Sequence, residues 1–306
     1  MFEALLAGGP LLEMWGTMFA LFGLGILIGT AAVMAGVGGG VIFVPLASAL
    51  FAIHVDFIRG AGLMVALVGA IAAAPVLMQR RLSRARIAVP LALAGSSGSI
   101  LGARLGLLVP DRAIMTALGV LMLGVAAQTT LQALRSRRAA ADAEAPPATS
   151  GTAGPGAGLS ERMAVAWELS GSYVDPGSGD TVDWRARRMV PAMLLFVLIG
   201  VIGGALGVGA GWANVPVLSS LMGLPLKMAA ATSGLIIVAN SSAAAWIYLR
   251  EGALDPMIVV PAIVGMIGGT RIGARLLGHA RPEQVRLLVI VVLLLAGLRT
   301  LWGVLQ

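Results

Sequence analysis

Two clusters of glycine are the residues of this sequence best suited to bind a ligand. Gly36–Gly40 and Gly207–Gly211 each interrupt an apolar run, and each precedes a Val-Pro pair that ends at Pro45 or Pro216. Glycine adopts backbone angles that other residues avoid and lets a ligand approach the main chain closely. A helix that restarts after such a break presents free amide hydrogens and its positive dipole end, which favour an anion. The candidate glycines are Gly36, Gly38, Gly39, Gly40, Gly207, Gly209 and Gly211.

Polar side chains within the apolar runs are the second group of candidates. Amides and hydroxyls inside a membrane need a partner, although Ser and Thr often bond to the carbonyl one turn earlier. Arg271 lies a full turn deeper in its run than Arg275. A cation at that depth without a nearby acid suits an oxoanion, whereas snorkelling to the headgroups is the alternative. These candidates are Asn214, Thr232, Ser233, Asn240 and Arg271.

Residues that could support catalysis or bind a transition metal are scarce. The sequence contains no cysteine and two histidines, His54 and His279, which both lie at the ends of apolar runs. The acidic residues lie at run ends or in a central polar segment, so the sequence offers no carboxylate relay across a membrane. Basic residues form short clusters rather than a basic face, which argues against nucleic-acid binding. We expect no enzymatic activity, no metal and no cofactor.

The composition is that of an integral membrane protein. Of the 306 residues, 58% are hydrophobic and 11% are charged, and the mean hydropathy is +0.94. About a quarter of the residues of a soluble protein are charged. About 20 apolar residues cross a bilayer as a helix, because every backbone amide must find its partner inside the segment. The apolar runs are 15–35, 41–53, 57–78, 87–109 and 113–134 in the first half, and 190–206, 212–224, 229–249, 257–278 and 285–305 in the second. The expected fold class is an all-α polytopic membrane protein.

The two halves of the sequence form an internal duplication. Gly36 corresponds to Gly207, and the motif Gly-Ala-Arg-Leu at Gly102 recurs at Gly273, with the same spacing of 171 residues (207 minus 36; 273 minus 102). Landmarks that keep one spacing over a long stretch indicate a repeat. Each repeat contains about five hydrophobic segments. The predicted domains are a first transmembrane repeat over 1–134, a polar and partly flexible linker over 135–189, and a second transmembrane repeat over 190–306.

The distribution of arginine predicts opposite orientations for the two repeats. Basic residues concentrate in cytoplasmic loops, so Arg80–Arg86 and Arg135–Arg138 are expected in the cytoplasm. The loop Arg250–Asp255, which matches Arg80–Arg86 in the second half, has no basic surplus and is expected outside. The sequence therefore predicts antiparallel repeats whose broken helices face each other near the bilayer midplane. The linker, in which Asp175–Asp180 indicates the turn of a small hairpin, is then cytoplasmic, and both termini lie outside.

These motifs resemble those of a known family. The paired glycine breaks followed by Val-Pro, the paired Gly-Ala-Arg-Leu and the polar linker are similar to the TauE/SafE sulfite exporter family, from about Leu21 to Leu305. The resemblance implies a transporter, and by expectation an exporter, of sulfite, thiosulfate, organosulfonates or related anions across the cytoplasmic (inner) membrane. The expected partners are therefore a small anionic substrate and the lipid bilayer.

Other functions remain open from the residues themselves. The chain could transport a different small organic anion. A structural membrane subunit would use the glycine breaks for packing and would move no anion. A membrane-embedded enzyme needs a nucleophile, base or metal at depth, whereas the apolar runs lack cysteine and carry histidine and carboxylates only at their ends.

Overall fold

The described part of the protein is almost entirely helical. The computed structural model describes residues 9–35, 38–79, 85–141, 170–174, 181–186, 188–276 and 282–305. Gly36, the Arg80–Arg84 part of the basic loop and linker residues 142–169 lie outside the described residues, together with the predictions made for them. Apart from connections and one small hairpin, the described residues form helices, so the all-α fold class is confirmed.

Ten apolar runs were expected, and helices occupy all of them. The first half contains α2 (Gly9–Ala35), α3 (Gly39–Leu50), α4 (Val55–Gln79), α5 (Ala85–Leu108) and α6 (Asp111–Ala141). The second half contains α8 (Met189–Leu206), α9 (Gly211–Pro216), the π-helical turn η1 (Val217–Leu221), α10 (Leu226–Arg250), α11 (Pro256–Leu276) and α12 (Pro282–Leu305). Within the described residues, seven helices are long and apolar enough to cross a membrane. The run 212–224 differs from its prediction, because it is divided into α9 and η1 rather than forming one short α-helix.

Proline and aspartate help to set where α11 and α12 begin. Pro256 and Pro282 are the first residues of these helices, where the amide hydrogen that proline lacks would have no intrahelical partner in any case. Asp255 Oδ1 accepts a hydrogen bond of 2.8 Å from the amide of Met257. This side chain thereby satisfies one of the free amides at the start of α11.

The helices of the two halves begin in register with the duplication. α4 begins at Val55 and α10 at Leu226, which are 171 residues apart (226 minus 55). The same spacing separates the start of α5 from that of α11 and the start of α6 from that of α12. The duplication seen in the sequence motifs thus extends to the helix boundaries.

Glycine brings helices of the two halves into close contact. Gly98 on α5 lies against the carbonyl group of Val197 on α8, and Gly269 on α11 lies in the same way against Ile26 on α2. Small residues allow this approach in membrane proteins. Thr30 Oγ1 also donates a hydrogen bond of 3.1 Å to the carbonyl of Gly269. Both pairings continue one turn further along both helices, so α5 runs in the same direction as α8, and α11 in the same direction as α2.

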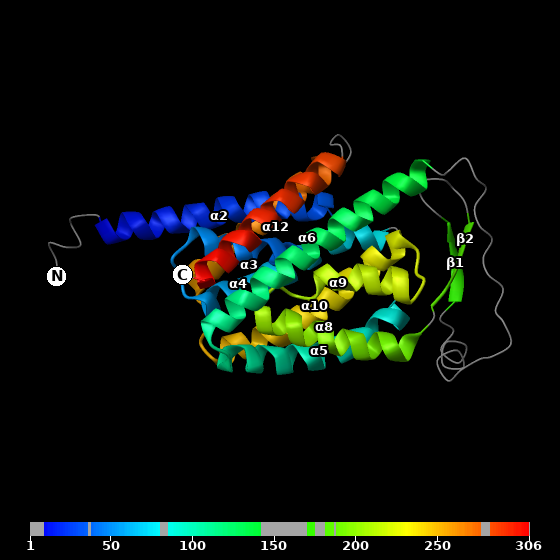
Figure 1. Ribbon diagram of the computed structural model, residues 1–306, viewed down its shortest axis with the longest axis horizontal. Coiled ribbons are helices and arrows are strands. Elements are labelled where there is room, and N and C mark those ends of the chain that lie inside the picture. The colour runs from blue at the N-terminus through cyan, green and yellow to red at the C-terminus, as the bar shows by residue number, and fades with distance from the viewer. Residues whose placement is uncertain are drawn as a thin grey trace.

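The start of α2 and the hairpin lie at opposite ends of the bundle. The start of α2 and the end of α12 lie at one end, and the strands β1 (Ser170–Val174) and β2 (Thr181–Arg185) lie at the other (Figure 1). β1 and β2 pair antiparallel, with Ser170 opposite Arg185. This pairing confirms the small hairpin predicted in the linker, whereas its predicted turn, Asp175–Asp180, lies outside the described residues.

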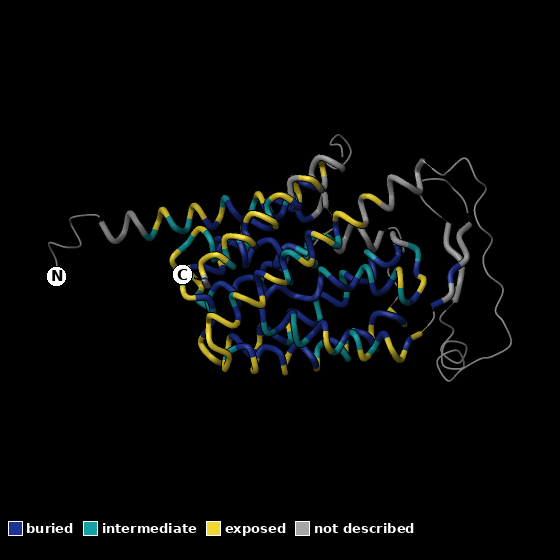
Figure 2. The backbone as a smooth tube through the Cα atoms, viewed as in Figure 1, coloured by how far each residue is buried: buried dark blue, intermediate teal, exposed yellow. Residues whose placement is uncertain are grey.

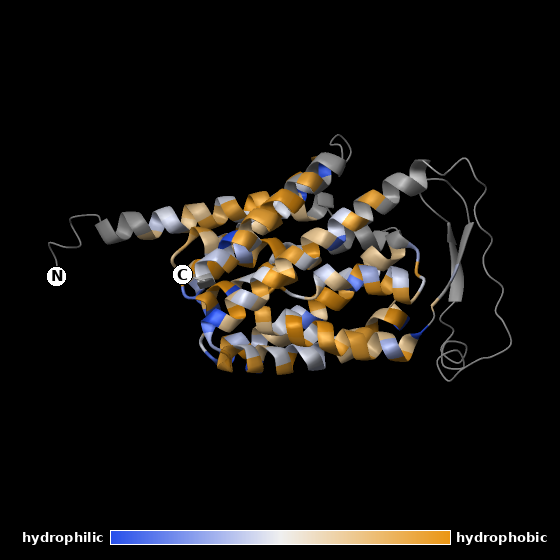
Figure 3. Cartoon of the chain, viewed as in Figure 1, coloured by the Kyte–Doolittle hydropathy of each residue, from blue (hydrophilic) through white to orange (hydrophobic). Residues whose placement is uncertain are grey.

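The bundle buries its core and exposes apolar side chains on its outside. Figure 2 shows buried residues along the inner faces of the helices, and Figure 3 shows hydrophobic residues on the outer faces. Trp212 packs against both of the larger core clusters, one formed mainly by α2, α3, α4, α6 and α11 and the other mainly by α5, α8, α9 and α10. Phe19, Leu108 and Trp302 are 69%, 81% and 67% exposed. An outer surface of this kind is suited to lipid, and the protein is a multi-pass membrane protein.

Candidate substrate-binding site

The two helix breaks meet inside the bundle. α3 begins at Gly39, directly after Gly38, whose backbone is extended (φ −61°, ψ 133°). α9 begins at Gly211, and a Cβ at Gly38 would lie 3.3 Å from the Cα of Gly211. The starts of two short helices from different halves of the chain therefore face each other at backbone contact distance.

The second break needs glycine at two positions. α8 ends before Gly207, which has a φ of +71°, and Gly209 has a φ of +69°. These left-handed angles are unfavourable for residues with a Cβ. A Cβ at Gly207 would also collide with the backbone of Arg59 on α4. At Gly209, a Cβ would lie 3.2 Å from the Cβ of Ala66 and 3.3 Å from Ser241 Oγ, so the main chain there lies close to a hydroxyl group.

Buried polar side chains without hydrogen-bond partners gather on α9 and α10. Within the described residues, both amide atoms of Asn214, Thr232 Oγ1, Asn240 Nδ2 and Ser241 Oγ have no partner, and the indole nitrogen of Trp212 has none either. The first four residues are at most 1% exposed. A buried polar group without a partner costs about 1–3 kcal/mol, and native proteins contain few of them. Five such residues on adjacent helices indicate a site for a polar ligand or for water.

Asn214 and Ser241 are the polar groups placed at the second break by their positions and contacts. Asn214 lies in the first turn of α9, and Ser241 lies beside Gly209. Asn240 is connected to α5, because Ser96 Oγ donates a hydrogen bond of 3.3 Å to Asn240 Oδ1. The second break thus has hydrogen-bonding side chains from α9 and α10 beside it, and α5 bonds to Asn240, the neighbour of Ser241.

Most of the polar candidates from the sequence lie in this group. Asn214, Thr232 and Asn240 are three of its members, and Ser233 is buried on α10 beside Thr232. Trp212 is a residue that the sequence did not single out. The sequence feature that could have identified Trp212 is a difference between the repeats, because the matching position in the first half is Val41.

The first break is filled by protein atoms. A Cβ at Gly39 would lie 2.6 Å from the terminal methyl group of Met266, and a Cβ at Gly40 would lie 2.7 Å from the carbonyl oxygens of Gly62 and Val208. Close packing, the alternative to ligand binding, therefore describes Gly39 and Gly40 in this structure. The polar candidates without hydrogen-bond partners lie in the second repeat.

Arg271 lies apart from the buried polar group. Its neighbours Gly269 and Thr270 face inward, with Gly269 packed against α2 and Thr270 only 3% exposed. Arg271 follows them on the outer face of α11 and is exposed. This position matches the alternative given for Arg271, a side chain that reaches toward the headgroups.

Arg59 is the buried charged residue that the sequence did not reveal. It is 0% exposed, and its Nη1 donates to Asp56 Oδ1 at 2.6 Å. Its Nη2 donates to the carbonyl oxygen of Ala205, and its guanidinium carbon lies 5.4 Å from the ring centroid of Tyr248. The sequence feature that could have identified this pair is the spacing of three residues between Asp56 and Arg59 near the start of an apolar run. This spacing places an acid and a base on one face of a helix.

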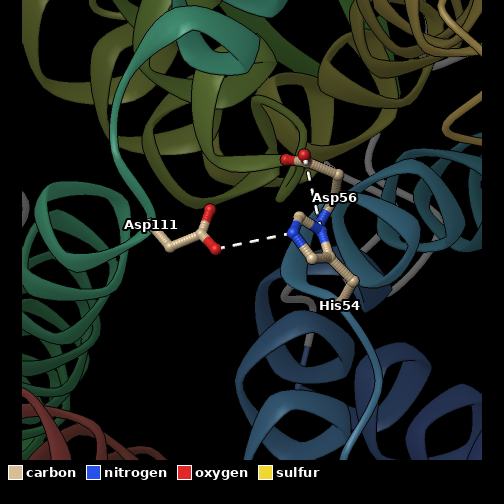
Figure 4. Close-up of side chains that lie close together, drawn as sticks. All are labelled: His54, Asp56 and Asp111. Carbon is tan, nitrogen blue, oxygen red and sulfur yellow. Dashed lines mark hydrogen bonds and ion pairs between the residues drawn. The ribbon is translucent and has the colours of Figure 1, made fainter.

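An exposed cluster of three titratable side chains joins Asp56 to α6 (Figure 4). His54 Nδ1 lies 3.5 Å from Asp56 Oδ2, and His54 Nε2 lies 3.5 Å from Asp111 Oδ2. The nitrogen and the carboxylate oxygens are close enough to share a cation. However, Asp56 is already paired with Arg59, and the side chains of His54 and Asp111 are more than half exposed. We interpret the cluster as polar contacts that tie the connection before α4 to the start of α6.

Comparison with known proteins identifies the family. Residues 21–300 match the family described as "Sulfite exporter TauE/SafE". The chain belongs to the TauE/SafE family. It is also 25% identical over 125 residues to the "Probable membrane transporter protein YunE" of Bacillus subtilis (strain 168), an alignment that covers 41% of this chain and 45% of that protein. No solved structure matches the chain significantly.

Membership of the TauE/SafE family places the buried polar group within a membrane transporter fold. Both glycine breaks and all the polar residues around them lie within the matched residues 21–300. The alignment with the Bacillus protein spans less than half of either chain. The TauE/SafE resemblance expected from the sequence motifs is therefore confirmed at the level of the family.

Proposed function

We propose that this protein is a secondary transporter that exports small sulfur-containing anions, such as sulfite, thiosulfate or organosulfonates, across the cytoplasmic membrane. The anion binds at the second helix break, where α9 begins. The proposal combines the family, whose description names sulfite export, with the chemistry of the buried polar group. It involves no covalent chemistry and no cofactor.

The observation that carries the proposal is the set of unpaired donors at the break. Asn214, Asn240, Thr232, Ser241 and Trp212 together offer amide, hydroxyl and indole donors that have no partner among the described residues. A small oxoanion carries several acceptor oxygens and loses its hydration when it enters a protein, so it needs several donors at once. Neutral donors stabilise the anion without a fixed positive charge, which favours release as well as binding.

The directions of the helices support an inverted repeat. α4 runs parallel to α11, because Gly60 lies by Ala253 near the start of α11 and Gly69 lies by Met266 in the middle. α4 and α5 are antiparallel, because Gly106 near the end of α5 lies against Arg59 near the start of α4, whereas residues 80–84 connect the end of α4 to the start of α5. Since α5 is parallel to α8 and α11 is parallel to α2, α8 opposes its counterpart α2.

An inverted repeat suits alternating access. When equivalent helices of opposite direction surround one site, exchanging the conformations of the two halves opens the site to the other side of the membrane. Packing by Met266 closes the first break, while the second break keeps its polar groups unpaired. The proposed transport path therefore passes between α4, α5, α9 and α10.

The test is anion flux through the purified protein in liposomes. Vesicles loaded with sulfite, and separately with thiosulfate or sulfoacetate, should lose the anion faster than protein-free vesicles. Protein carrying Asn214→Leu should lose that activity while inserting normally, because the near-isosteric side chain removes both unpaired amide atoms. The amount of inserted protein in each preparation is matched before the rates are compared.

Two outcomes would redirect the proposal. Flux of a carboxylate but of no sulfur-containing anion would establish a transporter of a different small organic anion. Absence of flux for every anion, together with correct insertion and normal stability, would favour the structural-subunit alternative, in which the glycine breaks serve helix packing.

A further inference from the structure

The end of α8 is held by side chains from two other helices. The last carbonyl groups of a helix have no amide partner within it, and α8 ends at Leu206 because Gly207 takes a left-handed angle. Tyr248 on α10 donates its hydroxyl to the carbonyl oxygens of Gly204 at 3.1 Å and Ala205 at 3.3 Å. Arg59 on α4 donates to the same Ala205 carbonyl.

Two of the three guanidinium nitrogens of Arg59 are held by protein contacts, whereas Nε has no hydrogen-bond partner within the described residues. Its Nη1 is paired with Asp56, its Nη2 contacts Ala205, and its guanidinium lies against the ring of Tyr248. Gly106 on α5 leaves the space into which Nη2 fits. A buried cation is costly unless it is paired and hydrogen-bonded. Its location at the negative end of the α8 dipole adds a favourable interaction.

The first repeat has no equivalent of this arrangement. The positions that match Arg59 and Tyr248 under the spacing of the duplication are Ala230 and Leu77, which carry neither a charge nor a hydroxyl. Within the described residues, this cap occurs at the break that also carries unpaired polar groups. The short segment Gly207–Ala210 joins the capped end of α8 directly to the start of α9.

We propose that Arg59 and Tyr248 are positioning residues that fix the carbonyl end of α8 and thereby hold the start of α9 in its anion-binding position. They act through the backbone of the second break and do not touch the anion. Asp56 supports them by neutralising the guanidinium of Arg59. This inference rests on the proposed function for its effect on affinity, but its effect on the backbone is independent of any substrate.

Hydrogen exchange measures the backbone effect directly. Tyr248→Phe keeps the ring and removes one hydroxyl, and Arg59→Lys keeps the charge and removes the forked donor. In purified full-length protein without substrate, both variants should increase amide exchange across residues 204–211 by at least about fivefold, as expected for loss of a hydrogen bond worth about 1 kcal/mol. Arg104→Lys is the matched control, because Arg104 is exposed on α5. It should leave exchange across this segment unchanged.

The functional effect is the change in affinity for sulfite. This affinity is measured from the rise in melting temperature that sulfite causes in the same proteins. Both positioning variants should lower the affinity for sulfite by about five- to tenfold, and Arg104→Lys should lower it by less than twofold. Weaker binding with unchanged exchange would overturn the inference, because the residues would then act on the anion rather than on the backbone. Unchanged exchange and unchanged binding would overturn it as well.

The two proposals fail in distinguishable ways. If the unmodified protein neither binds nor transports sulfite, the proposed function fails, and the exchange experiment still decides whether Arg59 and Tyr248 hold the break. If Arg59→Lys does not insert stably, Tyr248→Phe alone decides the outcome, since it deletes a single hydroxyl from a ring that remains packed.

Discussion

At the scale of single residues, the second break combines poor hydrogen-bond satisfaction with complete burial. Thr232 and Thr270 provide a matched comparison, because both are nearly fully buried on spanning helices. Thr232 Oγ1 has no partner, whereas Thr270 Oγ1 donates to the carbonyl of Met266 at 2.7 Å. Replacing an unpaired buried hydroxyl with a methyl group is neutral or stabilising, and deleting a paired one costs about 0.5–1.5 kcal/mol.

We therefore predict opposite effects for Thr232→Val and Thr270→Val. Thr232→Val should keep or raise the melting temperature of the protein. It should lower the affinity for sulfite by about 10-fold or more, as expected for a lost hydrogen bond to a charged group. Thr270→Val should lower the melting temperature and leave sulfite affinity within about twofold. Thermal melts with and without sulfite measure both quantities, and similar effects of the two substitutions on binding would exclude Thr232 from the site.

Arg271 and Arg275 lead to a second prediction at this scale. Both side chains are exposed on α11, so Arg271→Gln and Arg275→Gln should each change sulfite affinity by less than about threefold at one ionic strength. A loss of more than 10-fold for Arg271→Gln alone, measured by the same binding assay, would restore Arg271 as an anion ligand.

The polar candidates that the structure buries without partners differ in kind from the buried charge that the sequence missed. Asn214, Thr232 and Asn240 were identifiable because amides and hydroxyls inside apolar runs need a partner. The orientation of Arg271 was not, because lipid and protein interior are equally apolar and the pattern does not show which face of α11 is inside. Arg59 was missed because its burial depends on Tyr248 and Ala205, which lie far away in the sequence.

At the scale of elements, the length and spacing of apolar runs defined the helices well. The run that became α9 and η1 was the exception, because its division at Pro216 followed no signal that distinguishes it from Pro45. Pro45 lies within α3, whereas Pro216 ends α9. The contact between Gly38 and Gly211 was predicted in outline from the repeat, but the filling of the first break by Met266 depends on packing between α11 and α3.

The backbone of the second break gives a prediction for that element. Gly209→Ala forces a left-handed angle on a residue with a Cβ, which costs about 1–2 kcal/mol, and its Cβ meets Ser241 Oγ. We expect lower stability and loss of sulfite flux. Gly124→Ala on α6 is the matched control, because a Cβ there meets no atom within 4 Å and alanine favours a helix. Normal flux through the Gly209→Ala protein would show that the break does not form the site.

At the scale of the whole molecule, symmetric packing surrounds an asymmetric site. The contacts between α5 and α8 recur between α11 and α2 with the partners exchanged, so both halves use one packing scheme. The side chains at the breaks have diverged, since Asn214 and Asn240 correspond to Phe43 and Gly69 in the first half. The scaffold was predictable from the duplication, whereas the choice of one break as the binding site depended on departures from it.

The arrangement of the connections gives the final prediction, which concerns orientation in the membrane. His54, before α4, lies 3.5 Å from Asp111 at the start of α6, and Gly60 near the start of α4 lies against Ala253 in the connection before α11. These connections therefore lie at one end of the bundle, and the hairpin lies at the other (Figure 1). The sequence contains no cysteine, so single cysteines can report the accessibility of each end without background.

In intact cells, Glu251→Cys and Val109→Cys should react with a membrane-impermeant maleimide added outside, because both positions are exposed at the end of the bundle that carries α2's start. Gly154→Cys, in the linker, should react only after the cells are opened, since the basic clusters beside the linker favour the cytoplasm. Reaction of all three cysteines from the same side would contradict the antiparallel arrangement. Reaction of Gly154→Cys alone from outside would keep the inverted repeat and reverse its orientation, so the capped end of α8 would then face the cytoplasm.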